Sequence, residues 1–512
     1  MKHKKSNIIL EEYENKFSYK KSKTNLNIEF NRIAFIFFVF LVISIIFSIQ
    51  LLHLGSLKQV KKVTPVSNIK NYRADIMDRN GNYLAKTVSS IDIGINPVEI
   101  IDKQKLLINL KLLFPKKNYL EIKKKIDQNK FFYFEKKISL ENYEKIMLLG
   151  DKSIVPEEKL ARVYPQKNLF SHIIGQIDDD NQGISGIEKS FDDRLKQKKE
   201  PLKLTVDTDV QFLVREQLIK FNTIFRSKGA AAILMNVNNG EIISMVSYPD
   251  FDLNKREKIV DLDFINRATK GVYELGSVFK TFTVAAGLDQ NLIDVDTEFL
   301  DLPKSIRCAG QPIGEYSDNI PSDLTVEEIL IRSGNIGSVR IGQKLEIEKL
   351  KSFLEKVGVL NKIDFDIEEV GEPYPFKWGK CKLATVSFGH GITTTPLQLA
   401  KGYSIITNGG FDIKPTLIKR DEDNIKNKNR VIKEGISEKL NLILRKIVTN
   451  KEGTAELANI DGYEVGGKTG TAQKTTLGGY SNLKVNTFAS IFPTSKPKYA
   501  LIVLLEIGRA HV

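Results

Sequence analysis

An apolar segment near the N-terminus places the strongest constraint on the fold of this chain. Ile33–Leu54 is apolar except for Ser44, Ser48, Gln50 and His53. As a helix the segment would be about 33 Å long, enough to cross the hydrocarbon core of a bilayer. A buried helix rarely stays apolar over such a length, and the residues that follow lack the small-x-small pair of a signal-peptide cleavage site. An uncleaved transmembrane anchor is therefore predicted at residues 33–54.

The charges on either side of this segment predict its orientation. Eight lysine and arginine residues precede it and three lysines follow it closely. Because cytoplasmic flanks carry the excess of positive charge, residues 1–32 are expected to be a cytoplasmic tail, with the rest of the chain outside the cytoplasm. The net charge of +14 comes from lysines spread along the whole chain. No nucleic-acid recognition motif accompanies it, so a nucleic-acid partner is not predicted.

The two cysteines, Cys308 and Cys381, leave two interpretations open. They could form a disulfide in an oxidising compartment or remain two isolated thiols, and the sequence does not decide between these. No cluster of cysteines and histidines has the spacing of metal ligands, which argues against a zinc site.

The part of the chain after the anchor divides into two patterns. A short strand at Ile76–Asp78, the Asn80-Gly81 turn and a second strand predict a hairpin. Residues 100–160 are rich in Lys and Glu and show helical periodicity, which is typical of small solvated helices. A new folding unit is predicted to begin near Leu204.

This second unit is expected to be an α+β domain. Two apolar runs on either side of Asn238-Asn239-Gly240 predict a β-hairpin. Further strands are expected at Tyr463–Thr471, Thr487–Phe492 and Tyr499–Glu506, and helices at Val278–Leu288, Val326–Ile331 and Pro396–Ile406. Strands at both ends with helices between them favour a mainly antiparallel sheet flanked by helices.

A serine and a lysine in this unit, Ser277 and Lys280, form the first candidate catalytic motif. The predicted helix begins at Ser277, so backbone N–H groups and the positive end of the helix dipole would favour a developing oxyanion there. Lys280 would lie one turn later on the same face. A lysine buried among apolar residues can have a lowered pKa and act as the base for the serine. The alternative is an ordinary N-cap serine, and the same S-x-x-K pattern recurs in polar stretches such as Ser495–Lys498.

The second candidate motif is Ser333-Gly334-Asn335. It follows a predicted helix for which Thr325 or Asp323 is available as a cap. Ser317-Asp318-Asn319 has the same S-x-N pattern but lies in a turn-like stretch. Because a catalytic serine and amide must be held rigidly, residues 333–335 are the preferred site.

The third candidate motif is Lys468-Thr469-Gly470-Thr471, which fits a strand edge that faces a cleft. Lys468 adds a positive charge, and Gly470 lets a ligand approach the backbone closely. Thr469 and Thr471 offer hydroxyls to a carboxylate, and a backbone N–H can complete an oxyanion hole. The alternative is an exposed glycine-rich turn. A histidine base is disfavoured, because His390 in Gly389-His390-Gly391 better fits a structural role in a tight turn.

The three motifs in this order match the S-x-x-K, S-x-N, K-T-G signature, and the chain resembles class B penicillin-binding proteins over nearly its whole length. The segment Arg73–Ala85 looks like the family's first pedestal motif, and Arg162–Pro165 and Gly186–Glu188 resemble the later ones. Residues 273–283 are more similar to the division-specific members than to the elongation-specific ones.

The resemblance implies an α+β protein with an N-terminal transmembrane helix and two further domains. A mixed α/β pedestal of the dimerisation type is expected at 55–202. A penicillin-binding, β-lactamase-like transpeptidase domain with a mainly antiparallel sheet is expected at 203–506. The resemblance also implies a single-pass protein of the bacterial inner membrane with a periplasmic catalytic domain.

The same resemblance implies a reaction and its residues. Ser277 would attack the D-Ala-D-Ala bond of a peptidoglycan stem peptide with Lys280 as base, and Ser333 would relay a proton while Asn335 orients the donor. Lys468 would supply charge, and Thr469 and Thr471, on either side of Gly470, would bind the terminal carboxylate. β-Lactams would acylate the same serine. No metal or cofactor is implied, and the expected partners are the lipid bilayer, a membrane glycosyltransferase and other division proteins.

Other functions stay open at this point. An elongation-type transpeptidase, a D,D-carboxypeptidase or a β-lactamase would use the same motifs, although no convincing water-activating glutamate follows residue 335. A non-enzymatic β-lactam sensor or division scaffold is the alternative from a different class. Residues 507–512 follow the last predicted strand abruptly and match one reading frame of a common sequencing adapter, so a truncated gene with a non-native tail is expected.

Overall fold

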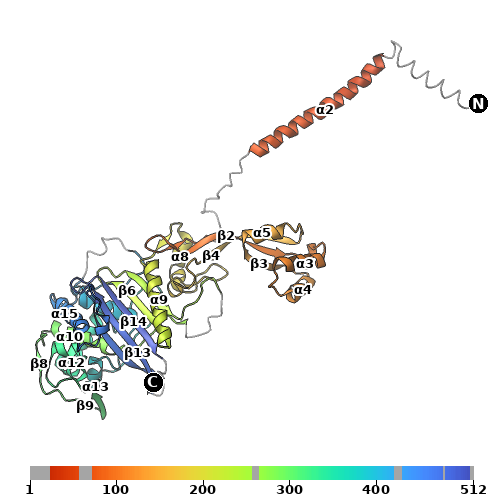
Figure 1. The fold of residues 1–512 in the computed structure, drawn as a ribbon. Coiled ribbons are helices and arrows are strands. Elements are labelled where there is room, and N and C mark those ends of the chain that lie inside the picture. The colour runs from red at the N-terminus through yellow and green to blue at the C-terminus, as the bar shows by residue number, and fades with distance from the viewer. Residues whose placement is uncertain (1–22, 57–71, 256–263, 420–428, 477–478, 508–512) are drawn as a thin grey trace, which may run out of the picture. The chain divides into compact units, whose positions relative to one another are not determined.

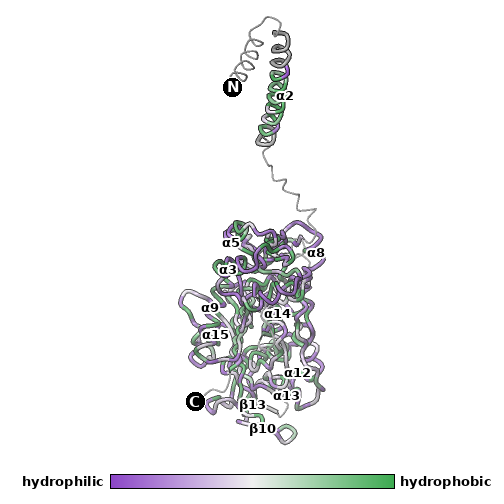
Figure 2. The backbone as a smooth tube through the Cα atoms, turned by 90° about the vertical axis from the view of Figure 1, so that its right-hand side faces the viewer, coloured by the Kyte–Doolittle hydropathy of each residue, from purple (hydrophilic) through white to green (hydrophobic). Residues whose placement is uncertain are grey.

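A computed structural model describes residues 23–56, 72–255, 264–419, 429–476 and 479–507, and the chain divides into two units after Lys70. The described part of the first unit is helix α2 (Lys23–Ser56). Its residues Arg32–Leu52 are apolar over a length that can cross a membrane (Figure 2). This matches the predicted anchor, whereas most of the predicted cytoplasmic tail and residues 508–512 lie outside the described residues.

The second unit begins with a pedestal of mixed α and β structure (Figure 1). Its strands are β1 (Ile76–Met77), β2 (Tyr83–Ile95), β3 (Phe132–Ile138), β4 (Ile154–Val163) and β5 (Leu202–Lys203). Its helices are the 3-10 turn η3 (Pro97–Glu99), α3 (Lys103–Leu113), α4 (Tyr119–Asp127), α5 (Leu140–Met147), α6 (Ser171–Ile174), α7 (Gly186–Ser190) and α8 (Asp192–Gln197). The predicted hairpin is confirmed, since β1 and β2 pair antiparallel with Ile76 opposite Ala85.

The interpretation of residues 100–160 as small solvated helices was incomplete. The helices exist, but α3, α4 and α5 cover a separate core that includes Leu106, Leu110, Ile126 and Ile146. Strands β3 and β4 also lie in this region, and both pair antiparallel with β2. Many of their outward residues are Lys and Glu. The apolar-polar alternation of a half-buried strand is therefore weak in this sequence, and the many charged residues favour a helical interpretation.

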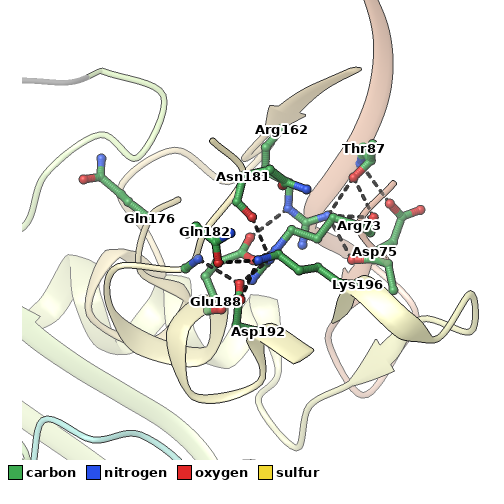
Figure 3. A network of polar contacts seen from close by, with 12 residues as sticks. Arg73, Asp75, Thr87, Arg162, Gln176, Asn181, Gln182, Glu188, Asp192 and Lys196 are labelled. Carbon is green, nitrogen blue, oxygen red and sulfur yellow. Dashed lines mark hydrogen bonds and ion pairs between the residues drawn. The ribbon is translucent and has the colours of Figure 1, made fainter. Parts of the chain in front are cut away.

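A buried ion network joins three distant segments of the pedestal (Figure 3). The carboxylate of Glu188 accepts from Arg73 Nε at 2.5 Å and from Arg162 Nε at 2.7 Å, and all three side chains are at most 2% exposed. Arg73 also contacts Asp192 at 2.7 Å. One carboxylate therefore holds the segment before β1, the end of β4 and helix α7 together.

The remainder of the second unit is built on a five-stranded sheet of order β12-β13-β14-β6-β7. Its strands are β6 (Ser227–Asn236), β7 (Ile242–Tyr248), β12 (Gly466–Thr476), β13 (Gly479–Phe492) and β14 (Tyr499–Ile507), all paired antiparallel. The helices are α9 (Thr208–Ile224), the 3-10 turn η5 (Gly276–Phe279), α10 (Lys280–Asp289), α11 (Val326–Ile331), α12 (Asn335–Lys356), α13 (Lys380–Ser387), α14 (Pro396–Thr407), α15 (Ile436–Thr449) and the 3-10 turn η7 (Glu456–Ala458). Short strands β8 (Glu298–Phe299), β9 (Ser305–Cys308), β10 (Gln311–Gly314) and β11 (Leu324–Thr325) form two small ribbons.

Both faces of the large sheet are covered by helices. On β6, Ala230 and Ala232 pack with Leu218 of α9, whereas Ala231 and Ile233 belong to the main core on the opposite face. Successive strand residues point to opposite faces, so this alternation places α9 on one side and α14 on the other. The α+β class and the antiparallel sheet with flanking helices are confirmed. Strands β12 and β14 lie close to their predicted positions, whereas β13 begins at Gly479, well before the predicted Thr487.

Of the two interpretations left open for the cysteines, the structure supports the disulfide, which joins Cys308 to Cys381. Cys308 lies at the tip of the β9–β10 hairpin, opposite Gln311. Cys381 lies in the first turn of α13. The bond therefore fixes the hairpin tip to a helix that packs against α12.

Candidate active site

Ser277 lies in the 3-10 turn η5, directly before α10. The α-helix thus begins at Lys280, slightly later than predicted, because the first turn is tightened into 3-10 geometry. Strand β12 runs closely beside this turn. A Cβ on Gly276, whose φ is +66°, would lie 2.5 Å from Thr471 O, and one on Gly470 would lie 2.2 Å from Leu275 O. Glycines at these two positions let the first and third motifs meet backbone to backbone.

Lys280 is completely buried, and its amine points at the second motif. Nζ lies 3.1 Å from Ser333 Oγ, 2.7 Å from Asn335 Oδ1 and 2.5 Å from the Ser333 carbonyl oxygen. Burial lowers the pKa of Lys280 to about 7, while the negative charge of Glu315 acts in the opposite direction. A large fraction of this lysine is therefore a neutral amine at physiological pH, as a general base requires.

The second motif occupies the junction between α11 and α12. Thr325 and Glu328 form a capping box at the start of α11, which confirms the predicted cap. Ser333 follows this helix with a φ of +59°, a left-handed conformation that costs energy for a residue with a Cβ and is held only where the surroundings impose it. By contrast, Ser317 lies in a loop where its hydroxyl accepts from Asn319 N. The structure thus brings Ser333, and not Ser317, into hydrogen-bond contact with Lys280.

Lys468 lies on β12, the edge strand of the sheet, and is also completely buried. Its Nζ donates to Ser333 Oγ at 2.9 Å and to Thr469 O at 3.1 Å. Burial lowers the pKa of Lys468 well below its ordinary value, and the nearby charge of Lys280 lowers it further. Thr471, one residue past Gly470, is exposed on the same strand, so its hydroxyl is accessible to a ligand.

Two further residues of the site were missed by the sequence analysis. Glu315 accepts from the backbone N–H groups of Asn335 and Ile336 at 2.6 and 2.9 Å. Thr454 lies 2.8 Å from Thr469 Oγ1 and 3.4 Å from Lys468 Nζ. Neither residue belongs to a recognisable sequence motif. Each lies in a loop, and only the three-dimensional course of that loop brings it to the site.

His390 follows a glycine that packs against the turn that holds Ser277. The backbone of the preceding Gly389 contacts the Gly276 carbonyl. The imidazole stacks on Phe388 and its Nδ1 lies 3.7 Å from the Glu274 carboxylate. Burial lowers the pKa of His390, and the ring contacts fit the structural role expected for it.

Comparison with known proteins gives a consistent result. Residues 230–510 match a family described as the penicillin binding protein transpeptidase domain, and residues 68–219 match the penicillin-binding protein dimerisation domain. The chain is 30% identical to a probable peptidoglycan D,D-transpeptidase FtsI of Caulobacter vibrioides, over 85% of this chain and 76% of that protein. It is 30% identical to the stage V sporulation protein D of Bacillus subtilis, over 85% of this chain and 74% of that protein. It is 27% identical to the peptidoglycan D,D-transpeptidase FtsI of Escherichia coli, over 86% and 79% of the two chains.

Proposed function

The chain belongs to the penicillin-binding proteins that join a dimerisation domain to a transpeptidase domain, and we propose that it is a serine-type peptidoglycan D,D-transpeptidase of septal cell-wall synthesis. The observation that carries this proposal is the convergence of Lys280 and Lys468 on the hydroxyl of Ser333, beside the turn that holds Ser277. The relatives named FtsI support the septal role.

Acylation begins with Ser277. Its Oγ attacks the carbonyl carbon of the penultimate D-alanine, and the hydroxyl proton passes to the neutral amine of Lys280. Backbone N–H groups of Ser277 and Thr471 stabilise the oxyanion that forms. The peptide C–N bond then breaks, and the leaving D-alanine amine takes a proton through Ser333, whose hydroxyl touches both lysines.

The rest of the site orients the donor and the acceptor. Lys468, Thr469 and Thr471 provide charge and hydroxyls for the terminal carboxylate, and Gly470 lets the peptide backbone lie against β12. Asn335 orients the donor chain. An amine from a second stem peptide then attacks the ester carbonyl, Ser277 Oγ recovers its proton, and a new peptide bond joins the two strands. A β-lactam undergoes the first step, but its leaving amine stays tethered.

The proposed placement of the chain follows from its domains. Residues 33–54 anchor the protein in the inner membrane, residues 1–32 lie in the cytoplasm, and the pedestal (55–202) and transpeptidase domain (203–506) lie in the periplasm. The charge difference across α2 supports this orientation. The disulfide between Cys308 and Cys381 also supports this placement, because disulfides form and persist in oxidising compartments such as the periplasm. A membrane glycosyltransferase and other division proteins are the proposed partners.

Labelling with a fluorescent penicillin tests this proposal. Full-length protein in detergent is incubated with the label, and the modified peptide is identified by mass spectrometry. Label is expected on Ser277, and Ser277→Ala should abolish it while leaving the unfolding temperature unchanged.

The matched control is Ser495→Ala, which removes a serine of the same S-x-x-K pattern in an exposed position. It should label like the wild-type protein. Rapid release of the label as hydrolysed penicillin would instead identify a β-lactamase. If cells that carry Ser277→Ala still cross-link their peptidoglycan normally, the protein is a non-enzymatic scaffold.

A further inference from the structure

The β9–β10 hairpin delivers two acceptors to the second motif. The carboxylate of Glu315, just after β10, accepts from Asn335 N at 2.6 Å and from Ile336 N at 2.9 Å. The carbonyl oxygen of the preceding Gly314 accepts from Asn335 Nδ2 at 2.8 Å. The backbone and the side chain of Asn335 are thus both held by the same short segment of the hairpin.

This segment is itself fixed at both ends. At the tip, Cys308 is bonded to Cys381 of α13. At the base, Glu315 N donates to Lys304 O at 3.1 Å, and Lys304 Nζ donates to the Asp318 carbonyl at 2.6 Å. The position of the Glu315 carboxylate is therefore set by a braced element, as precise placement of a neighbouring group requires.

We propose that Glu315 is a positioning residue of the acylation machinery, which holds Asn335 and, through it, the amine of Lys280. This inference rests on the proposed function. The chain of contacts is direct: Glu315 and Gly314 fix Asn335, and Asn335 Oδ1 in turn accepts from Lys280 Nζ at 2.7 Å. Because the amide nitrogen is occupied by Gly314 O, the amide oxygen must face the lysine.

The charge of Glu315 gives it a second effect on the same amine. Two charged groups face Lys280 from the elements packed against it, Lys468 from β12 and Glu315 from the hairpin. The negative charge of Glu315 raises the pKa of Lys280, against the larger effect of burial. Loss of this charge should lower that pKa further, so the neutral amine would persist to lower pH but would be a weaker base.

A purely structural role for Glu315 would be that of a helix cap, and the chain offers a matched cap elsewhere. Asp102 accepts from the backbone N–H groups of Gln104 and Lys105, each at 3.0 Å, at the start of α3 in the pedestal. Both carboxylates cap a helix with two bonds, but only Glu315 contacts a residue of the candidate site. Asp102→Asn is therefore the control for an effect of capping alone.

The test measures the second-order rate of acylation by a fluorescent penicillin between pH 5 and 9. The full-length wild-type protein is compared with Glu315→Gln, Glu315→Asp and Asp102→Asn. For Glu315→Gln the plateau rate should fall about tenfold, because the neighbouring amine is misplaced. The midpoint of its acid limb should move to lower pH by about half a unit or more. Glu315→Asp, which keeps the charge, should retain the wild-type midpoint and recover part of the rate.

The outcomes separate this inference from the proposed function. If Glu315→Gln labels like the wild-type protein at every pH and only its unfolding temperature falls, Glu315 is a cap and the inference is wrong while the function stands. If the wild-type protein takes no label, the proposed function fails and the inference fails with it. Asp102→Asn should change neither the plateau nor the midpoint, and a shift in that variant would also overturn the inference.

Discussion

Lys280 and Lys468 are both completely buried, and their amines converge on one oxygen, Ser333 Oγ, at 3.1 and 2.9 Å. Two buried ammonium groups so close together repel each other and have lost their hydration. The arrangement favours the loss of a proton from the pair, which leaves a neutral amine and a cation on either side of one hydroxyl. That hydroxyl can donate to the first and accept from the second.

The rate of acylation should therefore depend on pH near neutrality. Since the pKa of Lys280 is lowered to about 7 by burial, the neutral base form predominates above that value and is lost below it. The rate of labelling by penicillin should rise with pH through a midpoint near 7. Rapid-mixing measurements from pH 5 to 9 would determine it.

Lys280→Arg is the informative companion variant. Arginine stays charged over this whole range, so labelling should be very slow at every pH. A wild-type midpoint above pH 9 would contradict the assignment of Lys280 as a base.

The buried charge of Lys280 should also cost stability. The unfolded chain holds this proton up to an ordinary pKa of 10.5, but the folded chain only below about 7. The unfolded state therefore binds more protons between these values, and the free energy of unfolding should rise with pH across that window. Lys280→Met should abolish labelling yet raise the free energy of unfolding at pH 7 by about 1–3 kcal/mol.

Urea unfolding at pH 7 and pH 9 would check this prediction. The increase in the free energy of unfolding caused by Lys280→Met should be smaller at pH 9 than at pH 7. At the higher pH, proton binding by the lysine stabilises the unfolded chain less. If Lys280→Met is less stable than the wild-type protein at pH 7, the hydrogen bonds of the Lys280 amine stabilise the fold by more than its desolvation costs, which would contradict the prediction.

The disulfide should stabilise the transpeptidase domain. It closes a chain segment with a sequence separation of 73 residues between Cys308 and Cys381. Cys308→Ser with Cys381→Ser should lower the free energy of unfolding by about 2–4 kcal/mol. Thermal unfolding with and without a reducing agent would measure the effect, and the reductant should have no further effect on the double variant. Equal stability of reduced and oxidised wild-type protein would refute the prediction.

Removal of the Glu188 charge should destabilise the pedestal. Glu188 is completely buried between Arg73 and Arg162, so Glu188→Gln removes the carboxylate partner of the buried Arg162 and leaves Arg73 paired with Asp192 alone. The expected loss is about 3–5 kcal/mol, measured by urea unfolding. Glu141→Gln, which breaks an exposed pair with Lys145, should leave the unfolding midpoint unchanged. A similarly small effect in both variants would show that water or a rearranged side chain compensates the buried charge.

Local sequence patterns were sufficient for much of the architecture. The Asn80-Gly81 turn located the first hairpin, and a run of apolar residues located α2. Two apolar runs on either side of the Asn238-Asn239-Gly240 turn identified β6 and β7, and the sequence also located β12 and β14 and the second half of β13. These signals work because each is produced by contacts within a short stretch of chain.

Other features depend on contacts between distant residues and carry no local pattern. β3 and β4 were missed because their exposed residues are charged and only the partner strand β2 gives them their conformation. The pairing of the cysteines could not be decided because it depends on where the β9–β10 hairpin meets α13. Glu315 was missed for the same reason, since a single carboxylate in a loop says nothing about which helix it caps.

Strand β14 lies in the middle of the large sheet, between β13 and β6, although it is the last of the described strands in chain order. Its partner β6 ends at Asn236, whereas β14 begins only at Tyr499. During synthesis, β6 and β7 therefore emerge long before the strand that joins them to the β12–β13 pair. Such a long-range pairing is slow and leaves strand edges exposed until it forms. The time at which the ribosome releases residues 499–507 thus sets the earliest moment at which a nascent chain can bind penicillin.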